Sequence, residues 1–209
     1  MSLLILTSPH SKCPEDTERK CDLVAGLSSK IFNEICIKKG IPCIYLPGDD
    51  YRHNHDLNRQ NSRKTNYRIN LNNILKMNSP EKSLVNALVL DIHSFPNYRI
   101  EAAGDNNLFK KGEIPPDIVF LKGPKDQYKF NGKVINLCDT LYKKLNKDFT
   151  NKINCKIREH LTVLDILNNA SEYEIPGVLI EINEKYLENP NLLSIIVNSI
   201  LEIFTPLDI

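Results

Sequence analysis

Short apolar runs alternate along the chain with longer segments in which apolar residues recur at helical spacing. The short runs predict β-strands over residues 3–6, 42–46, 84–92, 117–121, 153–157 and 177–182. The periodic segments predict helices over residues 22–39, 65–76 and 135–145, and two more that begin at Thr162 and Pro190. The run 84–92 is the most hydrophobic, so we expect this strand in the centre of the sheet.

The segment 22–39 shows a clear helical pattern. Leucine or isoleucine stands at every fourth position from Leu23 to Ile35, and Gly40 follows where a helix C-terminus favours glycine. Strands and helices that alternate in this way predict an α/β fold, a three-layer αβα sandwich around a largely parallel or mixed central sheet. A chain of 209 residues, 41% of them hydrophobic, is long enough for one core, so we expect a single domain over residues 1–209.

Composition narrows the classes of function. The chain carries 27 basic and 26 acidic residues, a formal net charge of +1. Such an even balance of charge argues against a protein that coats nucleic acid or anionic lipid, because binding to either polyanion requires an excess of positive charge on the protein. No apolar run approaches the ~18–20 residues required to span a bilayer, and the N-terminal run has no basic region and stops at Pro9. We therefore expect no signal peptide, no membrane partner and a cytoplasmic location.

The cysteines are even in number, which raises the question of disulfides. They are Cys13, Cys21, Cys36, Cys43, Cys138 and Cys155. Because no secretory signal is expected and the chain is large enough to have its own core, we expect reduced thiols. No C-x-x-C motif is present, so neither a structural zinc knuckle nor a thioredoxin-like site is expected.

Candidate chemistry gathers where the predicted strands end, which is where ligands bind in open α/β sheets. His10 follows the first strand, and Asp91 and His93 lie at the end of the central one. Glu181 lies in the last strand, inside an apolar run. A lone histidine at a strand end is more often a hydrogen-bonded structural residue. A carboxylate in an apolar run is harder to explain, because its burial is costly unless it is paired, bound to metal or protonated.

Two polar stretches, 47–64 and 95–116, exceed the usual length of connections and are candidate functional loops. The first contains the sequence Asp-Leu-Asn-Arg at 56–59. Imidazoles, carboxylates and an arginine would then meet at one rim of the sheet. This set is typical of a catalytic zinc site, where imidazoles and a carboxylate bind the ion and an open position holds water. A further carboxylate accepts the proton of that water.

Three short stretches, in this order, resemble the zinc carboxypeptidase and N-formylglutamate amidohydrolase group. They are Asp-Leu-Asn-Arg at 56–59, Leu-Asp-Ile-His-Ser-Phe at 90–95 and Ile-Glu-Ile at 180–182. The pairing of D-x-N-R with a later D-x-H-S is the distinctive part. The resemblance implies a phosphorylase/hydrolase-like αβα fold and a single catalytic domain that hydrolyses an amide bond with Zn²⁺. It also implies site residues, namely His10 and His93 as zinc ligands, Asn58 and Arg59 on a substrate carboxylate, and Glu181 as general base.

The chain departs from this group at the second zinc ligand. Carboxypeptidases supply the first two ligands as H-x-x-E, whereas the third residue after His10 is Cys13. The carboxylate ligand is therefore Glu15, Asp16 or Asp22. We favour Asp22, because the start of the long first helix would hold it rigidly near the strand rim. Glu15 stays open as an alternative, and a thiolate of Cys13 is a less favoured one.

The same resemblance implies a substrate with a free carboxylate, either an N-acyl amino acid such as N-formylglutamate or a peptide C-terminus. The general base would take the proton of the zinc-activated water and pass it to the leaving nitrogen. Arg59 suits a planar carboxylate, since a guanidinium binds it in a bidentate manner. Arg52 or Arg63 would stabilise the oxyanion. Asp56 and Asp91 are expected to orient Arg59 or an imidazole of the site.

Two other functions stay open as alternatives. Tyr51 and Tyr67 are interleaved with the basic residues of the segment 52–68, a pattern that suits nucleic-acid phosphates, although we favour a carboxylate pocket or a solvated loop. A catalytically inactive family member that acts as a binding scaffold would explain the missing H-x-x-E. The presence of Glu181 argues for the enzyme, because a buried acid without a role is costly.

Overall fold

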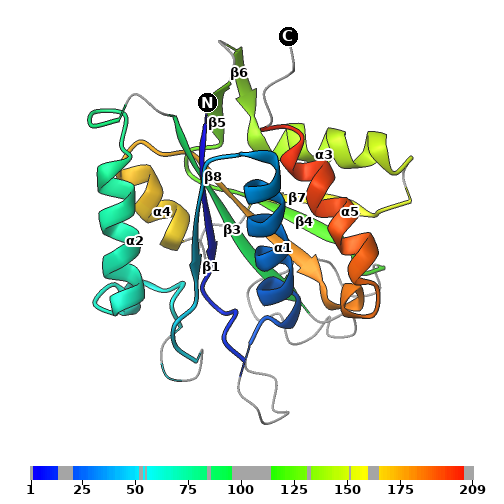
Figure 1. The fold of residues 1–209 in the computed structure, drawn as a ribbon, viewed down its shortest axis with the longest axis horizontal. Coiled ribbons are helices and arrows are strands. Elements are labelled where there is room, and N and C mark those ends of the chain that lie inside the picture. Colours follow the sequence, from blue (N-terminus) through cyan, green and yellow to red (C-terminus); the bar gives the residue numbers. More distant parts are fainter. Residues whose placement is uncertain are drawn as a thin grey trace.

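A mixed β-sheet of six strands forms the centre of the protein (Figure 1) in the part of the chain that the computed structural model describes. The described residues are 2–13, 21–51, 54, 56–83, 86–95, 114–130, 133–150, 152–159 and 165–204. The strands, in sheet order, are β2 Cys43–Pro47, β1 Leu3–Ser8, β3 Ala87–Phe95, β8 Gly177–Asn183, β4 Ile118–Lys122 and β7 Cys155–Glu159. β2, β1, β3 and β8 are parallel, whereas β4 is antiparallel to β8 and parallel to β7. The predicted largely parallel or mixed sheet is confirmed.

Helices cover both faces of this sheet (Figure 1). Their bounds are α1 Leu23–Lys39, α2 Asn66–Met77, α3 Leu137–Asp148, α4 Asp165–Glu172 and α5 Pro190–Leu201. α1, α3 and α5 bury one apolar cluster against one face, with Phe32, Leu141 and Ile196 among its members. α2 and α4 bury a second cluster against the other face, with Leu71 and Ile166. The expected three-layer αβα sandwich is confirmed.

The central strand β3 serves both clusters. Its nine residues are all buried, and Leu88 belongs to the first cluster while Val89 belongs to the second. Because side chains alternate along a strand, Asp91 and His93 lie on the same face as Val89, toward the α2 and α4 layer. The most hydrophobic strand therefore ends in polar side chains that are still inside the protein.

Local sequence sets the ends of several helices as predicted. Gly40 ends α1 in the left-handed conformation with φ 65°, where the absence of Cβ removes the steric cost. The side chain of Thr65 accepts a hydrogen bond from the first turn of α2. Pro190 opens α5, and the Asn189 side chain caps it.

Other predicted elements differ in detail. The helix predicted over 135–145 begins only at Leu137, because the residues before it form the hairpin of β5 (Gln127–Phe130) and β6 (Lys133–Asn136), which the pattern did not indicate. Short 3₁₀ helices at Gln60–Ser62 and Glu184–Glu188 were also not predicted. The start of the predicted strand at 84 and the helix start at Thr162 lie outside the described residues.

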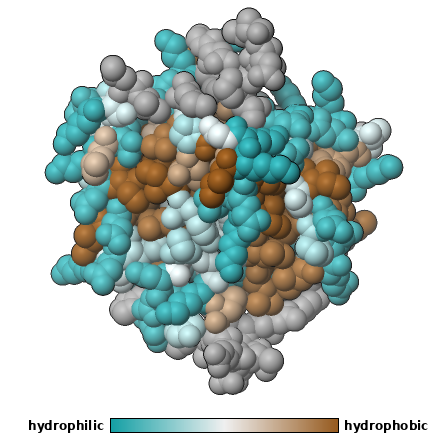
Figure 2. All heavy atoms as spheres, viewed as in Figure 1, coloured by the Kyte–Doolittle hydropathy of each residue, from teal (hydrophilic) through white to brown (hydrophobic). Residues whose placement is uncertain are grey.

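The surface in Figure 2 shows a hydrophobic area over α1 and α5. Partly buried apolar side chains of these two helices pack against the first core cluster, namely Leu27, Ile31, Ile35 and Leu192. Among the helices in the described ranges, none has both the length and the apolar character needed to cross a bilayer.

Candidate metal centre

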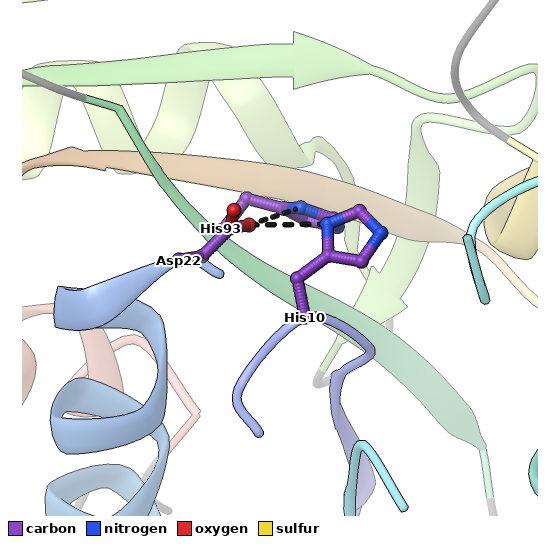
Figure 3. A group of neighbouring side chains, drawn as sticks. All are labelled: His10, Asp22 and His93. Atoms are coloured by element: carbon purple, nitrogen blue, oxygen red, sulfur yellow. Dashed lines mark hydrogen bonds and ion pairs between the residues drawn. The ribbon is translucent and has the colours of Figure 1, made fainter. Parts of the chain in front are cut away.

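Three polar side chains point toward one another at the carboxyl ends of β1 and β3 (Figure 3). His10 lies in the turn after β1, Asp22 directly precedes α1, and His93 lies near the end of β3. Asp22 Oδ2 is 2.9 Å from His93 Nδ1 and 3.3 Å from His10 Nδ1. The two imidazole rings meet edge to face, with centroids 4.9 Å apart. All three side chains are almost fully buried.

Backbone contacts bring these residues together. β1 and β3 are parallel neighbours, so the turn that follows β1 carries His10 to the end of β3. The Asp22 N–H then donates a hydrogen bond of 3.0 Å to the His10 carbonyl. In the first turn of α1, the Val24 N–H donates to Ser94 Oγ over 3.2 Å. The start of α1 is thus fixed both to the turn and to the strand that carries His93.

The charges of the group are strongly coupled. Burial alone would raise the pKa of Asp22, but the charge of His10 and hydrogen bonds with both imidazoles outweigh it and hold this pKa well below its usual range. Burial alone would lower the pKa of His93, but Asp91 and Asp22 outweigh it and raise this pKa well above its usual value. Without a metal ion, Asp22 is therefore a carboxylate and His93 holds a proton.

The outer nitrogen of each imidazole faces a further carboxylate. His10 Nε2 lies 2.7 Å from Asp56 Oδ1, and His93 Nε2 lies 3.2 Å from Asp91 Oδ2. Asp91 is held in turn by the hydroxyl of Thr7, which donates to its Oδ1 over 2.7 Å. A carboxylate on the far nitrogen is the usual partner of a metal-binding histidine, because it sets the ring orientation and the tautomer. The predicted orienting roles of Asp56 and Asp91 agree with these contacts.

The group can hold a metal ion. One possible ligand atom from each of His10, Asp22 and His93 lies within 4.8 Å of the others. Two imidazole nitrogens and one carboxylate oxygen are a donor set that Zn²⁺ uses in catalytic sites. Charge also fits, because the two imidazoles are in contact with carboxylates on every ring nitrogen and a divalent cation would offset that negative charge. The alternative ligands Glu15 and Asp16 lie outside the described residues.

Glu181, the predicted general base, lies on the strand next to His93. β8 pairs with β3 in parallel, and Glu181 stands opposite His93 in the register. Register partners in a parallel pair point to the same face, so the half-buried Glu181 side chain lies on the face that holds the imidazole. This placement agrees with the predicted proximity, and the catalytic role stays a prediction.

The predicted carboxylate-binding residues Asn58 and Arg59 follow directly on Asp56. Asn58 is buried, and its side chain lies 3.3 Å from His93 Nε2 and accepts the Ile166 N–H over 3.3 Å. Arg59 Nε donates to Asp56 Oδ2 over 3.2 Å, and its side chain is 41% exposed. Arg59 is therefore at the rim of the group, whereas Asn58 lies beneath it and joins His93 to the start of α4.

Arg63, one of the two arginines predicted to contact the substrate at its oxyanion, pairs with acidic side chains of α4. It donates to both carboxylate oxygens of Asp165, over 3.2 and 3.0 Å, and pairs with Glu172 over 3.1 Å. Arg68 donates to the same Asp165 over 2.7 Å and to the Leu57 carbonyl over 3.0 Å. The alternative Arg52 lies outside the described residues.

Arg68 is a residue whose place the sequence analysis missed. Its side chain is 1% exposed, and Tyr67 beside it is equally buried. The two cannot take part in an exposed strip for nucleic acid. A signal was present in the spacing, since Arg68, Leu71 and Leu75 recur on one helix face, while Ile69, on another face of the same helix, is 47% exposed.

Comparison with known proteins identifies the fold. No protein-family model and no curated protein matches the sequence. A gene product of Agrobacterium tumefaciens, Atu2144, matches with a TM-score of 0.61 and 12% identity, over 98% of this chain and 92% of that chain. N-formylglutamate amidohydrolase from Ralstonia eutropha JMP134 matches with a TM-score of 0.57 and 14% identity, over 97% and 94%. The chain shares their fold. The αβα fold that the sequence resemblance implied is thus confirmed.

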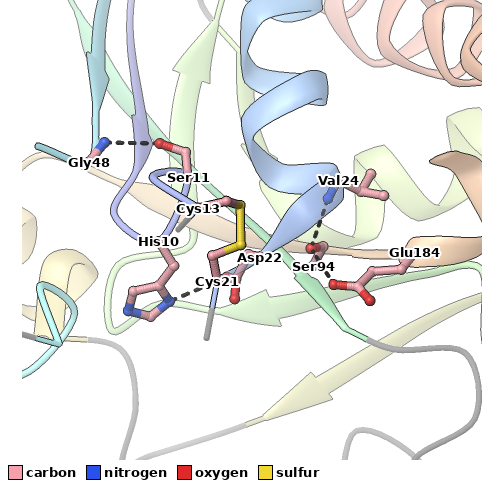
Figure 4. The surroundings of a disulfide bond; sticks show 9 residues. All are labelled: His10, Ser11, Cys13, Cys21, Asp22, Val24, Gly48, Ser94 and Glu184. Atoms are coloured by element: carbon pink, nitrogen blue, oxygen red, sulfur yellow. Dashed lines mark hydrogen bonds and ion pairs between the residues drawn. A yellow bond between two sulfur atoms is a disulfide. The ribbon is translucent and has the colours of Figure 1, made fainter. Parts of the chain in front are cut away.

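A disulfide bond joins Cys13 and Cys21 beside the candidate metal centre (Figure 4). The expectation of reduced thiols is wrong for this pair, whereas Cys36, Cys43, Cys138 and Cys155 are free. The turn after β1 and the start of α1 bring the two Cα atoms to 5.1 Å, a separation that a disulfide spans. The spacing of the cysteines in the sequence does not predict this pairing. While bonded to Cys21, Cys13 is not the thiolate ligand that we considered.

Proposed function

We propose that the protein is a zinc-dependent hydrolase that cleaves an amide bond in a small substrate with a free carboxylate. N-acyl amino acids, such as N-formylglutamate, and peptide C-termini are the candidate substrates. The observation that carries the proposal is the convergence of His10, Asp22 and His93 within 4.8 Å at the carboxyl ends of the strands. The presence of an N-formylglutamate amidohydrolase among the proteins with this fold supports the class of reaction.

His10, Asp22 and His93 would hold the ion in this proposal. What Zn²⁺ supplies when bound is the acidification of a water molecule toward a pKa of ~7 and the polarisation of a carbonyl. Asp56 and Asp91 receive the outer imidazole N–H groups, so both Nδ1 atoms can offer their lone pairs to the ion. The burial of the group excludes competing water and strengthens every charge interaction within it.

Glu181 moves the proton. Its carboxylate accepts the proton that the attacking water gives up, and it then donates this proton to the leaving nitrogen of the amide. The register of β8 against β3 supports this role, because it sets Glu181 beside His93 on one face of the sheet. A carboxylate is suited to the task, since it acts as base in the first step and as acid in the second.

Arg59 binds the substrate carboxylate. It is half exposed at the rim, and Asp56, which also contacts His10, holds its Nε. Arg63 is already paired with Asp165, and the Asn58 side chain is already shared between His93 and Ile166. We therefore give these two residues positioning roles and leave recognition of the carboxylate to Arg59.

A second candidate function is an inactive scaffold that binds a partner. The observation in its favour is Cys13, which stands where carboxypeptidases have a glutamate ligand and which is engaged in a disulfide. The two functions differ in whether the purified protein holds a metal ion.

Metal analysis by mass spectrometry tests the proposal. We expect about one zinc per chain in the purified protein, as in a catalytic site with three protein ligands. His10→Ala and His93→Ala should lose it, whereas Lys64→Ala, which changes an exposed residue, should keep it. A wild-type protein that takes up no metal would favour the scaffold.

A substrate screen then tests the reaction class. The zinc-loaded protein is given N-formylglutamate, other N-acyl amino acids and short peptides, each beside an analogue whose free carboxylate is converted to an amide. We expect hydrolysis of at least one carboxylate-bearing compound and a much slower reaction with its neutral analogue. Failure with every compound would contradict the proposed class of substrate.

A further inference from the structure

The Cys13–Cys21 disulfide spans the segment between two of the proposed metal ligands. Cys13 follows His10 by three residues, and Cys21 directly precedes Asp22. Figure 4 shows the bridge beside the side chains of His10 and Asp22, between the turn after β1 and the start of α1. The bridge therefore links two points of the chain that lie beside the proposed ligands His10 and Asp22.

Each side of the bridge is held by a different strand. On the His10 side, the Gly48 N–H donates to Ser11 Oγ over 3.0 Å, which fixes the turn to the end of β2. On the Asp22 side, the bond from Val24 to Ser94 fixes α1 to β3. The disulfide is the covalent link between these two anchored sides, next to the point where the ligands meet.

The position of the Asp22 carboxylate depends on how the backbone at this residue is held. It has extended dihedral angles, φ −93° and ψ 90°, and its side chain makes no capping hydrogen bond with α1. Its carboxylate instead faces the two imidazoles. The Asp22 N–H bond to the His10 carbonyl joins the same two parts of the chain next to the bridge. If the disulfide is reduced, this hydrogen bond must hold the two parts of the chain together without the covalent link.

The bridge is also partly exposed, so a small reductant can reach it. Cys13 and Cys21 are partly exposed, whereas Cys36, Cys138 and Cys155 are buried. Burial raises the pKa of Cys155 to about 12, so this thiol is a poor nucleophile for exchange. Thiol chemistry at the bridge can therefore proceed without involving the buried core thiols.

We propose that the Cys13–Cys21 disulfide is a redox-sensitive positioning element that holds Asp22 in the metal centre, so that its reduction weakens metal binding. The inference rests on the proposed function for the ion that is bound. Reduction by a dithiol proceeds by two exchange steps. One thiolate attacks a bridge sulfur and releases the other cysteine thiolate, and the second thiolate then displaces the remaining cysteine. The chain gains two electrons and two protons as two thiols, and the dithiol leaves as a disulfide.

The affinity for Zn²⁺ tests the inference. Competition with a chromophoric chelator measures Kd for the oxidised protein, for the protein reduced with a phosphine, and for Cys13→Ser/Cys21→Ser, which lacks both the bridge and its thiols. Cys43→Ser, at a free cysteine away from the bridge, is the matched control. We expect Kd to rise at least about tenfold in the reduced protein and the double variant, the range found when groups that orient metal ligands are lost. The control should match the oxidised protein.

Two results would overturn the inference. One is a double variant whose Kd stays within about twofold of the oxidised value. The other is tighter binding by the reduced protein together with a thiolate-to-metal charge-transfer band when Co²⁺ replaces Zn²⁺. In that case the released thiols would be ligands, and the bridge would block the site instead of shaping it.

Amide hydrogen exchange in the metal-free protein separates this inference from the proposed function. We expect the Asp22 N–H to exchange at least about tenfold faster after reduction and in the double variant, because its bond to His10 loses covalent support. The Val24 N–H, held by Ser94, should change less. Equal protection of Asp22 in both redox states would contradict the inference, whatever the metal content. Absence of zinc in the oxidised protein would instead contradict the proposed function.

Discussion

Two groups of charged side chains, one buried and one partly buried, lie close together in this protein and differ in kind. The histidine cluster consists of His10, Asp22 and His93, and the arginine cluster consists of Arg63, Arg68 and Asp165. In the arginine cluster, one carboxylate accepts hydrogen bonds from two guanidinium groups. In the histidine cluster, atoms that can bind a cation converge on one another, and carboxylates of Asp56 and Asp91 surround them.

The difference shows how to separate a structural ion-pair network from a ligand site. A guanidinium is a permanent cation with no lone pair to offer, so the arginine cluster has its positive charge built in. An imidazole can exchange its proton for a metal ion, so the histidine cluster can take its positive charge from outside. We therefore expect substitutions in the arginine cluster to reduce stability and those in the histidine cluster to reduce metal binding.

The largest contrast should come from the same substitution in both clusters. Asp22→Asn should weaken Zn²⁺ binding by about 100-fold or more, since a ligand contributes more than the outer partners whose loss costs about 10–100-fold. Asp165→Asn should keep the metal. Metal content after dialysis against a chelator measures both. Equal retention by the two variants would remove Asp22 from the ligand set.

Glu181→Gln shows whether the histidine cluster supports catalysis or only binds metal. We expect turnover to fall by about 10²–10⁴-fold, the usual contribution of a general base, with zinc content unchanged. Steady-state kinetics with the best substrate of the screen gives the ratio. Glu188→Gln, at an exposed position soon after β8, is the control and should have wild-type turnover. An unchanged rate in Glu181→Gln would exclude this residue as the base.

Asp165→Asn should reduce the free energy of unfolding by about 3 kcal/mol, because the Arg68 guanidinium, 1% exposed, loses its carboxylate partner. Urea unfolding followed by circular dichroism measures the change. Glu172→Gln, which removes a largely exposed partner of Arg63, should cost less than about 1 kcal/mol. Comparable losses of stability in the two variants would mean that burial of the ion pair does not determine how much stability is lost.

The same carboxylate predicts a pH dependence. Burial would raise the pKa of Asp165, but hydrogen bonds and charge from Arg63 and Arg68 lower it below its usual value. A lowered folded-state pKa gives stability that is present above the unfolded-state pKa of about 3.9 and is lost as pH falls through the folded-state value. The stability difference between wild type and Asp165→Asn should hold near neutral pH and shrink below about pH 4. A difference that grows on acidification would contradict this assignment.

Arg59→Ala should have the smallest effect. We expect KM for carboxylate-bearing substrates to rise about tenfold with little change in kcat, because an exposed guanidinium contributes uniform binding. Lys64→Ala removes the same charge nearby and is the control. An equal increase of KM for neutral analogues would show that Arg59 does not recognise the carboxylate.

Features that depend on local chemistry could be predicted from the sequence. Gly40, Thr65 and Pro190 mark helix ends because their backbone and side-chain preferences act within a few residues. The proximity of His10 and His93 could also be predicted, since both follow from strand ends that must meet at one edge of a parallel sheet. The structure confirms that proximity, and their role as metal ligands stays a prediction.

Features that depend on contacts between distant segments could not be predicted. The partner of Cys13 is set by where α1 starts relative to the turn after β1, and not by the spacing of cysteines. The burial of Arg68 requires Asp165 from α4, almost a hundred residues away. Asn58 was expected to face substrate, and its contacts with His93 and Ile166 exist only because α4 packs at this end of the sheet.

The Asn58 amide has a consequence for how genetic data on this protein would be interpreted. It touches an imidazole of one cluster and the helix that carries the central carboxylate of the other. A substitution in α4 can therefore shift the imidazole of His93 through the Asn58 side chain. A mutational screen scored by activity alone would count Asp165 as a catalytic residue. A parallel measurement of folding would show that Asp165 acts by stabilising the fold.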